Sequence, residues 1–450
     1  MQARMARKPP AIDGRITGDK TMNSKKRAAA PQDITSSVTR RVLLKSAAAS
    51  AVIGAAPSLV CAQASTIKIG MSAITTGRFA YAGLGQVVAN KLVFDQINAA
   101  GGIEGRKLEL IVRDSRNLPE EAVKNVRSLI NSDGCTIIIS AESSSAAAAI
   151  NESLRDTKVT CFQVNSEASS LTADPKKFNP LVFRVARQGI HDAIAGGAIV
   201  SRLARERGLT RWATAAPDYA FGRETTQQFI DYYQYFGGKM EVVAQVWPKF
   251  GAPDFTEVVT KLLSSNCEAL YSLCFGGDLI SLVEQGNLYG LFQNKLSVMP
   301  LYSDYGVIDT IKQQPRDVIV QNRYNWAYPA TAANRKWYDD YLKLSSGSKP
   351  NNWSWQSGAA AQFIVNGLRA TKGDTNPVKV AAAIRGTSAQ VPFGLDGKVT
   401  LRAEDNTLIN YPMAYGMAVS AEPFVKEWIS ADWKVILEQE AAWKKKQGYV

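Results

Sequence analysis

From residue 65 onward, strand-like segments alternate with helix-like segments, and this alternation constrains the fold more than any other feature of the sequence. Apolar, strand-like runs lie at 66–71, 107–113, 136–140 and 159–164. Between them, apolar residues recur at helical spacing, as in the face formed by Leu84, Val88 and Leu92. Strands that alternate with helices form parallel sheets with helices on both faces. We therefore predict an α/β fold built on doubly wound parallel sheets.

The same alternation starts again near Ile190. The strand-like segments of this second series lie at 211–215, 241–247 and 269–273. Its helix-like segments lie at 193–207, 223–236, 255–264 and 279–288. A chain of 450 residues also exceeds what one hydrophobic core usually supports. Two lobes of similar α/β construction are therefore expected.

Residues 1–64 have a different character. They hold eleven Lys and Arg residues against three Asp residues, and so carry +8 of the net charge of +13. Arg40 and Arg41 precede an Ala-rich, weakly apolar run, and Ala62-Gln63-Ala64 has the Ala-x-Ala pattern of a signal cleavage site. This pattern predicts a disordered leader with a twin-arginine signal, cleavage near Ala64 and a periplasmic location. The alternatives are a chance arginine pair, a membrane anchor, for which the run is too short, and lipid attachment at Cys61, which the bulky Val60 does not suit.

Most functions that require a polyanion, a metal or an imidazole are disfavoured by the composition. The 386 residues after the leader carry a net charge of only +5, and their Lys and Arg residues are scattered among acidic residues. No nucleic-acid partner is therefore expected. The chain has one histidine, His191, which opens a helix beside Asp192 and is expected at the surface. No nucleophile elbow or nucleotide-binding glycine motif is present. We therefore expect no metal, no cofactor, no transmembrane segment after the leader and no catalysis.

Four cysteines follow the leader, and none has the C-x-x-C spacing of a zinc site. Cys267 and Cys274 flank one strand and would lie about 23 Å apart, too far for a disulfide. Cys135 and Cys161 each begin a strand-like run. A disulfide between these two and a pair of buried free thiols both remain open.

Several motifs of the chain resemble those of one protein family. They are Ile67-Lys68-Ile69-Gly70, Arg113-Asp114-Ser115, Asp218-Tyr219-Ala220-Phe221-Gly222 and, most specifically, the run from Asp95 to Arg106 with its Ile-Asn-Ala-Ala-Gly-Gly core. Over most of residues 66–420 the sequence resembles the solute-binding proteins of branched-chain amino acid ABC transporters. These are type I periplasmic binding proteins of the leucine/isoleucine/valine family and its amide-, urea- and aromatic-acid-binding relatives.

The resemblance implies two doubly wound lobes that are joined by three crossovers and close on a ligand by a hinge motion. It places lobe 1 at 65–187 and 328–390, and lobe 2 at 188–327 and 391–450, after the leader at 1–64. It also implies a small-molecule ligand, an ABC permease as partner, and a monomer.

Candidate ligand contacts in lobe 1 follow the strand-like run 136–140, because open α/β sheets bind ligands at the carboxyl ends of their strands. Ser143, Ser144 and Ser145 lie there, just before a helix. Hydroxyl groups and free backbone N–H groups at a helix N-terminus suit a carboxylate, although one serine would also suit the helix cap. The resemblance adds the loop after the next strand, where Ser166 lies.

In lobe 2, the resemblance implies that Tyr219 packs on the ligand, and Phe275 follows another strand end. At about the position of Asp304, amino-acid-binding members carry an acid that pairs with the ligand ammonium; here Asp304 alternatively caps a helix after a strand-like run at 298–302. Tyr219 alternatively braces a turn.

Two places depart from common members of the family. Arg78 and Tyr81 offer a cation and a ring in the first loop, with a solvated arginine as the alternative. Trp353 and Trp355 offer an aromatic pocket or simple core packing. The ligand is therefore left open among amino acids, aromatic carboxylates and amides. The other functions that remain open are a ligand sensor for a membrane receptor and an exported α/β enzyme.

Overall fold

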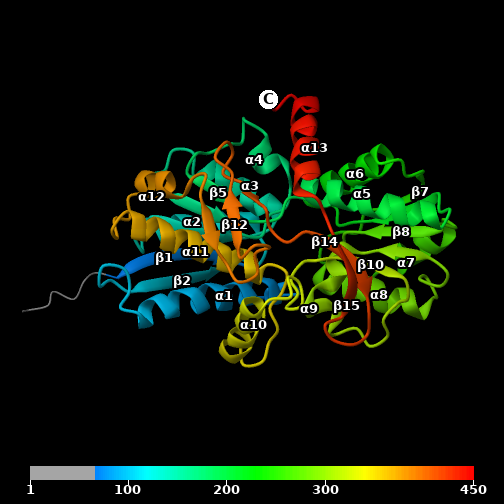
Figure 1. Ribbon diagram of the computed structural model, residues 1–450, viewed down its shortest axis with the longest axis horizontal. Coiled ribbons are helices and arrows are strands. Elements are labelled where there is room, and N and C mark those ends of the chain that lie inside the picture. Colours follow the sequence, from blue (N-terminus) through cyan, green and yellow to red (C-terminus); the bar gives the residue numbers. More distant parts are fainter. Residues whose placement is uncertain (1–65) are drawn as a thin grey trace, which may run out of the picture. The chain divides into compact units, whose positions relative to one another are not determined.

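The computed structural model describes residues 66–450, so the predicted leader, twin-arginine signal and cleavage site lie outside the described residues (Figure 1). The first sheet is fully parallel, with the order β2-β1-β3-β4-β5. Its strands are β1 (Ile67–Ala73), β2 (Leu108–Asp114), β3 (Ile137–Ala141), β4 (Thr160–Gln163) and β5 (Val182–Arg184). β3 consists of buried residues only, as expected for a central strand covered on both faces.

Helices cover both faces of this sheet. Ile137 and Ile139 of β3 join the core that contains residues of α1 (Ala80–Ala99) and α11 (Ser354–Ala370). Ile138 points the other way, into the core formed with α2 (Pro119–Asn131) and α3 (Ser144–Ser153). The apolar runs of the sequence thus become a strand that feeds two cores by simple alternation.

The second sheet repeats this design and adds two strands, with the order β15-β14-β10-β9-β8-β6-β7. Its five parallel strands are β6 (Arg211–Ala215), β7 (Glu241–Val246), β8 (Ala269–Ser272), β9 (Leu296–Val298) and β10 (Val318–Gln321). They have the same spatial order as β1–β5, while β14 (Ala414–Ala418) and β15 (Val425–Ser430) run antiparallel at one edge. The predicted α/β fold with two doubly wound parallel sheets is confirmed.

The helices of the second sheet are α5 (Gly189–Glu206), α6 (Ala220–Tyr235), α7 (Thr256–Ser264), α8 (Gly276–Leu288) and the short α9 (Tyr305–Ile308). α5 packs against α6, and the last helix α13 (Trp433–Lys446) packs against α5. The short α4 (Ser170–Ala173) follows β4.

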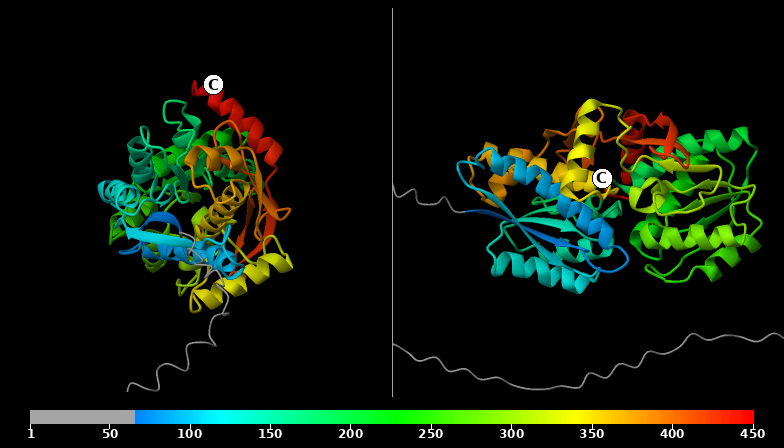
Figure 2. Two further views of the ribbon diagram at one scale, coloured as in Figure 1. Left: turned by 90° about the vertical axis from the view of Figure 1, so that its left-hand side faces the viewer. Right: turned by 90° about the horizontal axis from the view of Figure 1, so that it is seen from below.

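Three crossovers join the two sheets. They are 185–188 between β5 and α5, 322–331 between β10 and α10 (Ala332–Leu344), and 410–413 before β14. α10 and α11 return to the first sheet, where both pack against α1 (Figures 1 and 2). Below, lobe 1 means residues 66–184 and 332–409, and lobe 2 means residues 189–321 and 414–450.

A small sheet of β11 (Ser388–Gln390), β12 (Lys398–Leu401) and β13 (Leu408–Ile409) precedes the third crossover, and α12 (Pro377–Ile384) leads into it. The sequence-based division assigned residues 391–409 to lobe 2. In the structure Thr407 forms a bridge with Arg184 of β5, so this segment pairs with the first sheet. Short strands next to turns do not indicate in the sequence which sheet they join.

Two local predictions are wrong. His191 is fully buried, because α13 covers the first turn of α5 and brings Glu440 within 3.1 Å of the imidazole. The strand predicted at 298–302 ends at Val298 and continues as a 3₁₀ helix, Pro300–Ser303.

For Cys135 and Cys161 the sequence left a disulfide and buried free thiols open, and the structure shows free thiols. Within residues 66–450 all four cysteines are free and buried, so no disulfide joins Cys135 and Cys161. Cys161 lies opposite Ile138, three residues beyond Cys135, and such an offset of about 10 Å along the strands is too long for a bridge.

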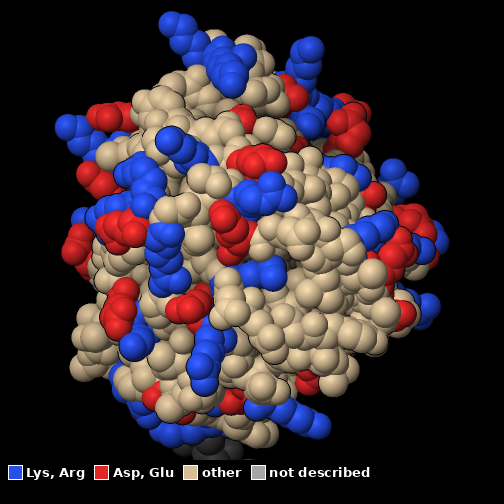
Figure 3. All heavy atoms as spheres, turned by 90° about the vertical axis from the view of Figure 1, so that its right-hand side faces the viewer, with Lys and Arg blue, Asp and Glu red and all other residues tan. Residues whose placement is uncertain are grey.

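The surface of the described chain carries mixed charges. Figure 3 shows the face on the lobe 2 side, where Lys and Arg side chains are interspersed with Asp and Glu side chains. A nucleic-acid-binding face would instead carry a basic stripe or patch. Among the helices of residues 66–450, none is long and apolar enough to cross a membrane.

Candidate ligand-binding site

A small cavity lies where the carboxyl ends of the strands of both sheets come together. From lobe 1 it is lined by loops after three strands and by Trp353 at the start of α11, that is by Ile74, Phe79, Ala82, Ser143, Ser144, Asn165, Glu167 and Trp353. From lobe 2 it is lined by loops after four strands, with Tyr219, Phe221, Phe250, Phe275 and Leu301. This is the ligand position that the fold class favours, the crevice beyond the carboxyl ends of open parallel sheets.

Aromatic rings from the two lobes meet at this cavity. The ring centroid of Phe79 in lobe 1 lies 4.3 Å from that of Phe250 and 5.2 Å from that of Phe275, both in lobe 2. Phe275 also meets Trp353 of lobe 1 at 5.7 Å in an edge-on contact. The cavity that remains has a volume of about 30 Å³, which is room for one or two water molecules. The two lobes thus touch mainly through rings at this point.

Gly276 permits this close approach. It begins α8 with a positive φ of 53°, and a Cβ atom there would lie 3.0 Å from ring atoms of Tyr81 and 3.1 Å from Phe79. Any larger residue at position 276 would therefore push the rings of lobe 1 away from lobe 2.

The polar side of the cavity is built by the loops after β3 and β4. The Ser144 hydroxyl oxygen accepts hydrogen bonds from the backbone N–H groups of Glu167 and Ala168, at 3.2 and 3.1 Å. Ser143 occupies the N-cap position of α3, but its side chain makes no capping hydrogen bond within the described chain. The first-turn N–H groups of α3 therefore have no side-chain cap beside the cavity.

Glu167 connects the cavity to the crossovers. Its carboxylate oxygen Oε1 accepts a hydrogen bond from the Arg323 guanidinium, which also donates to Asp192 at 2.7 Å and to Asn352 at 2.9 Å. All four side chains are buried, so this chain of contacts runs from the cavity into the polar interior between the lobes.

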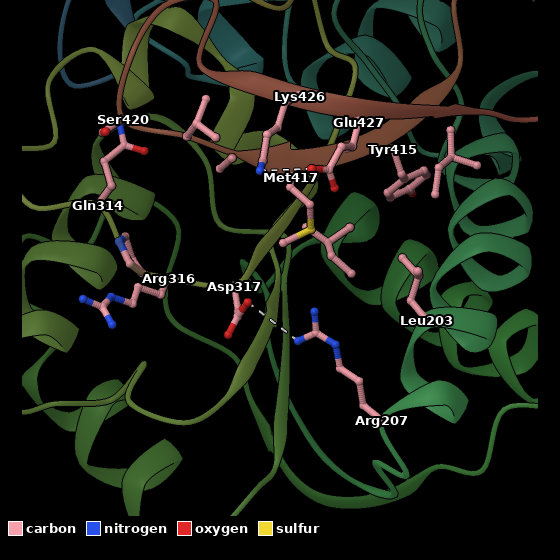
Figure 4. Close-up of a pocket in the computed structure, with 16 residues that line it drawn as sticks. Leu203, Arg207, Gln314, Arg316, Asp317, Tyr415, Met417, Ser420, Lys426 and Glu427 are labelled. Atoms are coloured by element: carbon pink, nitrogen blue, oxygen red, sulfur yellow. Dashed lines mark ion pairs between the residues drawn. The ribbon is translucent and has the colours of Figure 1, made fainter.

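A larger groove of about 660 Å³ lies elsewhere, between the end of α5 and the strands β10, β14 and β15 (Figure 4). Two ion pairs lie in this groove, Arg207 with Asp317 at 3.8 Å and Lys426 with Glu427 at 3.0 Å. Asp317 precedes β10, so the groove lies at the amino end of that strand, away from the loops that form the small cavity. Within residues 66–450, no cluster of three or more His, Cys, Asp or Glu side chains could hold a metal ion.

Comparisons with known proteins agree with this site geometry. A family model described as periplasmic binding protein matches residues 66–421. The chain belongs to the periplasmic binding protein family. Family membership implies a periplasmic location and a solute-binding rather than a catalytic type of protein.

Curated relatives and solved structures that resemble this chain are also solute-binding proteins by their names and titles. The chain is 23% identical, over 77% of its length and 90% of the relative, to a leucine-, isoleucine-, valine-, threonine- and alanine-binding protein of Pseudomonas aeruginosa. An ABC transporter solute-binding protein of Rhodopseudomonas palustris BisB5, solved with 3,4-dihydroxybenzoic acid, shares the fold with a TM-score of 0.73 at 19% identity. That likeness covers 82% of this chain and 97% of the other. A closed amino-acid-binding protein of Brucella ovis has a TM-score of 0.65 at 21% identity and covers 82% of this chain and 94% of its own.

In this periplasmic binding protein, four of the nine predicted site residues line the cavity, namely Ser143, Ser144, Tyr219 and Phe275. Ser145 is exposed on α3 and does not line the cavity. Ser166 is buried and does not line the cavity, while its neighbours Asn165 and Glu167 do.

Asp304 also lies outside the cavity lining. It caps α9, where its carboxylate accepts a hydrogen bond from the Gly306 N–H at 2.9 Å, and a second from the Asn352 N–H at 3.2 Å. Burial raises the pKa of Asp304 to about 6. Asp304 was expected either to pair with a ligand ammonium or to cap a helix, and the structure shows the helix cap.

Arg78 and Tyr81 lie beside the cavity rather than in it. The Arg78 guanidinium reaches across to lobe 2, where it donates to Ser281 at 3.0 Å and lies 3.6 Å from the Asp278 carboxylate. Burial raises the pKa of Asp278 to about 6 despite this arginine. The Tyr81 ring packs edge-on against Trp353 at 6.0 Å, and its hydroxyl is buried without a partner in the described part of the chain.

Trp353 and Trp355 have different roles, one in an aromatic pocket and one in core packing. Trp353 lines the cavity, whereas Trp355 packs in the core against Phe393 and Tyr411. Sequence reasoning did not select three other cavity residues, Phe79, Phe250 and Glu167. Each follows a strand of a parallel sheet, so a search of every strand end, rather than of the family motifs alone, would have found them.

Proposed function

We propose that this protein captures a small organic molecule between its two lobes and presents it to an ABC permease, with amino acids, aromatic carboxylates and amides as the candidate ligands. The observation that carries the proposal is the cavity formed jointly by strand ends of both sheets, with polar groups on one side and aromatic rings on the other. Ligand sites of this kind combine an apolar lining with a few placed polar groups. The relatives named above bind such molecules, by their names and titles.

Ligand entry in this proposal requires the lobes to separate. A cavity of about 30 Å³ is smaller than any amino acid or aromatic acid, so the contacts of Phe79 with Phe250 and Phe275 must part. The three crossovers supply the hinge, and a ligand that touches both lobes stabilises their closed arrangement. Ser143 and Ser144 hold the polar end, and Tyr219 and Phe275 hold the apolar part.

The protein acts without catalysis in this proposal. Its single histidine lies against Glu440 and Tyr411 between α5 and α13 and does not line the cavity. The cavity residues therefore hold, orient and release a ligand, and no bond is made or broken.

A thermal-shift screen of the protein against amino acids, aromatic acids and amides tests this function. A ligand at about 100 times its Kd stabilises the folded protein by about 2.7 kcal/mol, which is a clear shift in Tm. A screen in which no member of these three classes raises the Tm contradicts the proposal.

Ser144 and Ser145 provide a matched pair for the site. Ser144→Ala removes a hydroxyl from the cavity and two hydrogen bonds to the Glu167 loop, so we expect about tenfold weaker binding of the ligand that the screen identifies. Ser145→Ala alters an exposed neighbour on the same helix, and binding within about twofold of the wild type is expected. Equal affinities of the two variants would remove Ser144 from the site.

A further inference from the structure

The last helix of the chain, α13, touches both lobes. It follows β15 of lobe 2 and lies after residue 421, where the match to the family model ends. Figure 1 shows it in red above the junction of the two lobes. Of its 14 residues, Ile436 and Glu440 alone are buried. A helix owes most of its stability to the packing of an apolar face. Because α13 buries so little apolar surface, its position depends on polar contacts.

Three of these contacts hold α13 to lobe 2 and to the third crossover. The His191 imidazole at the start of α5 lies 3.1 Å from the Glu440 carboxylate. The Tyr232 hydroxyl of α6 donates to a backbone oxygen of α13 at 2.9 Å. The Trp433 indole N–H donates to the backbone oxygen of Tyr411 in the crossover, also at 2.9 Å. One set of contacts therefore fixes the helix on lobe 2.

A second set of contacts joins α13 to lobe 1. Arg402, the residue that follows β12, donates from Nη1 to Glu440 Oε2 at 2.6 Å and from Nη2 to Oε1 at 2.7 Å. The Lys444 ammonium lies 2.7 Å from the Asp405 carboxylate and 3.3 Å from that of Glu440. Two parallel hydrogen bonds between an arginine and a carboxylate form the strong type of ion pair. None of the four side chains is more than 15% exposed, so salt screens these pairs little.

The charges of this cluster cancel. Arg402 and Lys444 are two cations, Asp405 and Glu440 are two acids, and each acid contacts both cations. Such a cluster is costly to break, because loss of one member leaves its partner buried and unpaired. A rotation that moves residues 402–405 away from α5 must break these ion pairs or detach α13 from lobe 2.

We propose that α13 is a strap across the two lobes, which favours their closed arrangement and is released on one side when the lobes separate. The inference rests on the hinge motion of the proposed function and adds a device that controls how easily the cleft opens. The residues of the strap do not line the cavity. The strap therefore acts on the opening of the lobes without contact to a ligand.

The distance between two spin labels, one on each lobe, measures the opening in the absence of any ligand. Lys91→Cys in α1 and Glu284→Cys in α8 place the labels at exposed positions of helices that begin on the two sides of the cavity. The four cysteines of residues 66–450 are buried and are not expected to take up label. Double electron–electron resonance on the whole protein then gives the ratio of separated to closed molecules.

Lys444→Met and Lys445→Met form a matched pair, because the two neighbours carry the same charge but Lys445 is exposed. We expect Lys444→Met to raise the ratio of separated to closed molecules at least about fivefold, and Arg402→Met at least about tenfold, since each removes contacts to lobe 1 that the closed arrangement makes. Lys445→Met should stay within about twofold of the wild type. If Arg402→Met does not fold, the comparison of the two lysine variants decides.

Two results overturn the strap. One is a wild-type protein whose lobes are mostly separated, and the other is a Lys444→Met distribution that coincides with that of Lys445→Met. Both results are independent of the thermal-shift screen, because the distance measurement uses no ligand. A screen that finds no ligand therefore contradicts the proposed function alone, and unchanged distances contradict the strap alone.

Discussion

The two lobes are connected by two buried regions of opposite character, a charged network at the crossovers and a ring-lined cavity at the strand ends. In the network, Arg187 of the first crossover donates to backbone oxygens of Asn322 in the second and Pro412 in the third, at 3.0 and 3.2 Å. It also pairs with Asp192 at 2.8 Å. At the cavity, the lobes touch through rings, and Glu167 Oε2 has no partner within the described residues.

This difference between charged and aromatic contacts indicates which contacts can change when a ligand binds. Charged groups of the network are directional and buried, so parting them would leave charges unpaired in a low-dielectric interior. Ring contacts have no such requirement and contribute about 0.5–1.5 kcal/mol each beyond the area they bury. The crossovers therefore fix the hinge about which the lobes turn. The ring contacts at the cavity, in contrast, can separate and form again around a ligand.

Removal of Arg323 should have the largest effect, because it breaks the network at the point where it reaches the cavity. Arg323→Met leaves Glu167 and Asp192 buried with one cation fewer. We expect the free energy of unfolding to fall by about 3–5 kcal/mol, because removal of one charge leaves its partner buried and unpaired. Urea-induced unfolding of the two proteins measures this difference.

Arg335→Met is the matched control. Arg335 is half-exposed, pairs with Asp339 on the same helix and stacks on Trp326. A loss of about 1 kcal/mol or less is expected. If the Arg323 variant loses no more stability than the control, the network does not hold the crossovers together.

Glu142 provides a second test of the comparison, because it is a buried acid that pairs with no cation among residues 66–450. Asp192 faces two arginines, whereas Glu142 accepts hydrogen bonds only from the hydroxyls of Ser72 and Ser115, and burial raises its pKa to about 7. An acid whose pKa is higher in the folded state than in the unfolded state binds its proton more tightly when folded. Its contribution to stability is therefore present below the unfolded pKa and is lost as the pH rises through about 7.

The variant Glu142→Gln imitates the protonated acid at every pH. Relative to the wild type, we expect its free energy of unfolding to be nearly unchanged at about pH 4 and to gain up to roughly 3 kcal/mol at about pH 8. Thermal or urea unfolding at the two pH values measures this. A stability difference that does not vary with pH would contradict the raised pKa.

The order of strands and helices, and the edge of the sheet where ligands bind, could be predicted from the sequence because both depend on local periodicity. Ser143 and Ser144 were found in this way, since strand Ile137–Ala141 and the following helix were clear. The helix cap by Asp304 could be anticipated, but its second contact could not, because that one comes from Asn352, 48 residues further along the chain. Which acid faces the cavity depends on such long-range pairs.

Burial of His191 was missed for a related reason. Its first turn of α5 has polar neighbours and would be exposed if the helix were alone. The helix α13 covers it from 249 positions later, through Glu440, which also pairs at 2.6 Å with Arg402, the residue that follows β12. No pattern within either helix indicates that the two helices meet.

The contact of Arg78 across the cavity mouth is expected to have the smallest effect, and it tests whether a charged pair at the rim acts like the network or like the rings. Arg78 is 37% exposed and lies 3.6 Å from Asp278, and exposed pairs of this kind contribute about 1 kcal/mol or less. We therefore expect Arg78→Gln to weaken binding of the ligand found by the screen less than about fivefold, and to reduce the dependence of the affinity on salt. Arg223→Gln is the control, because Arg223 pairs with Asp218 within lobe 2 and spans no lobe boundary. A loss well above tenfold in Arg78→Gln alone would mean that the guanidinium binds the ligand directly, and the rim would then belong to the site.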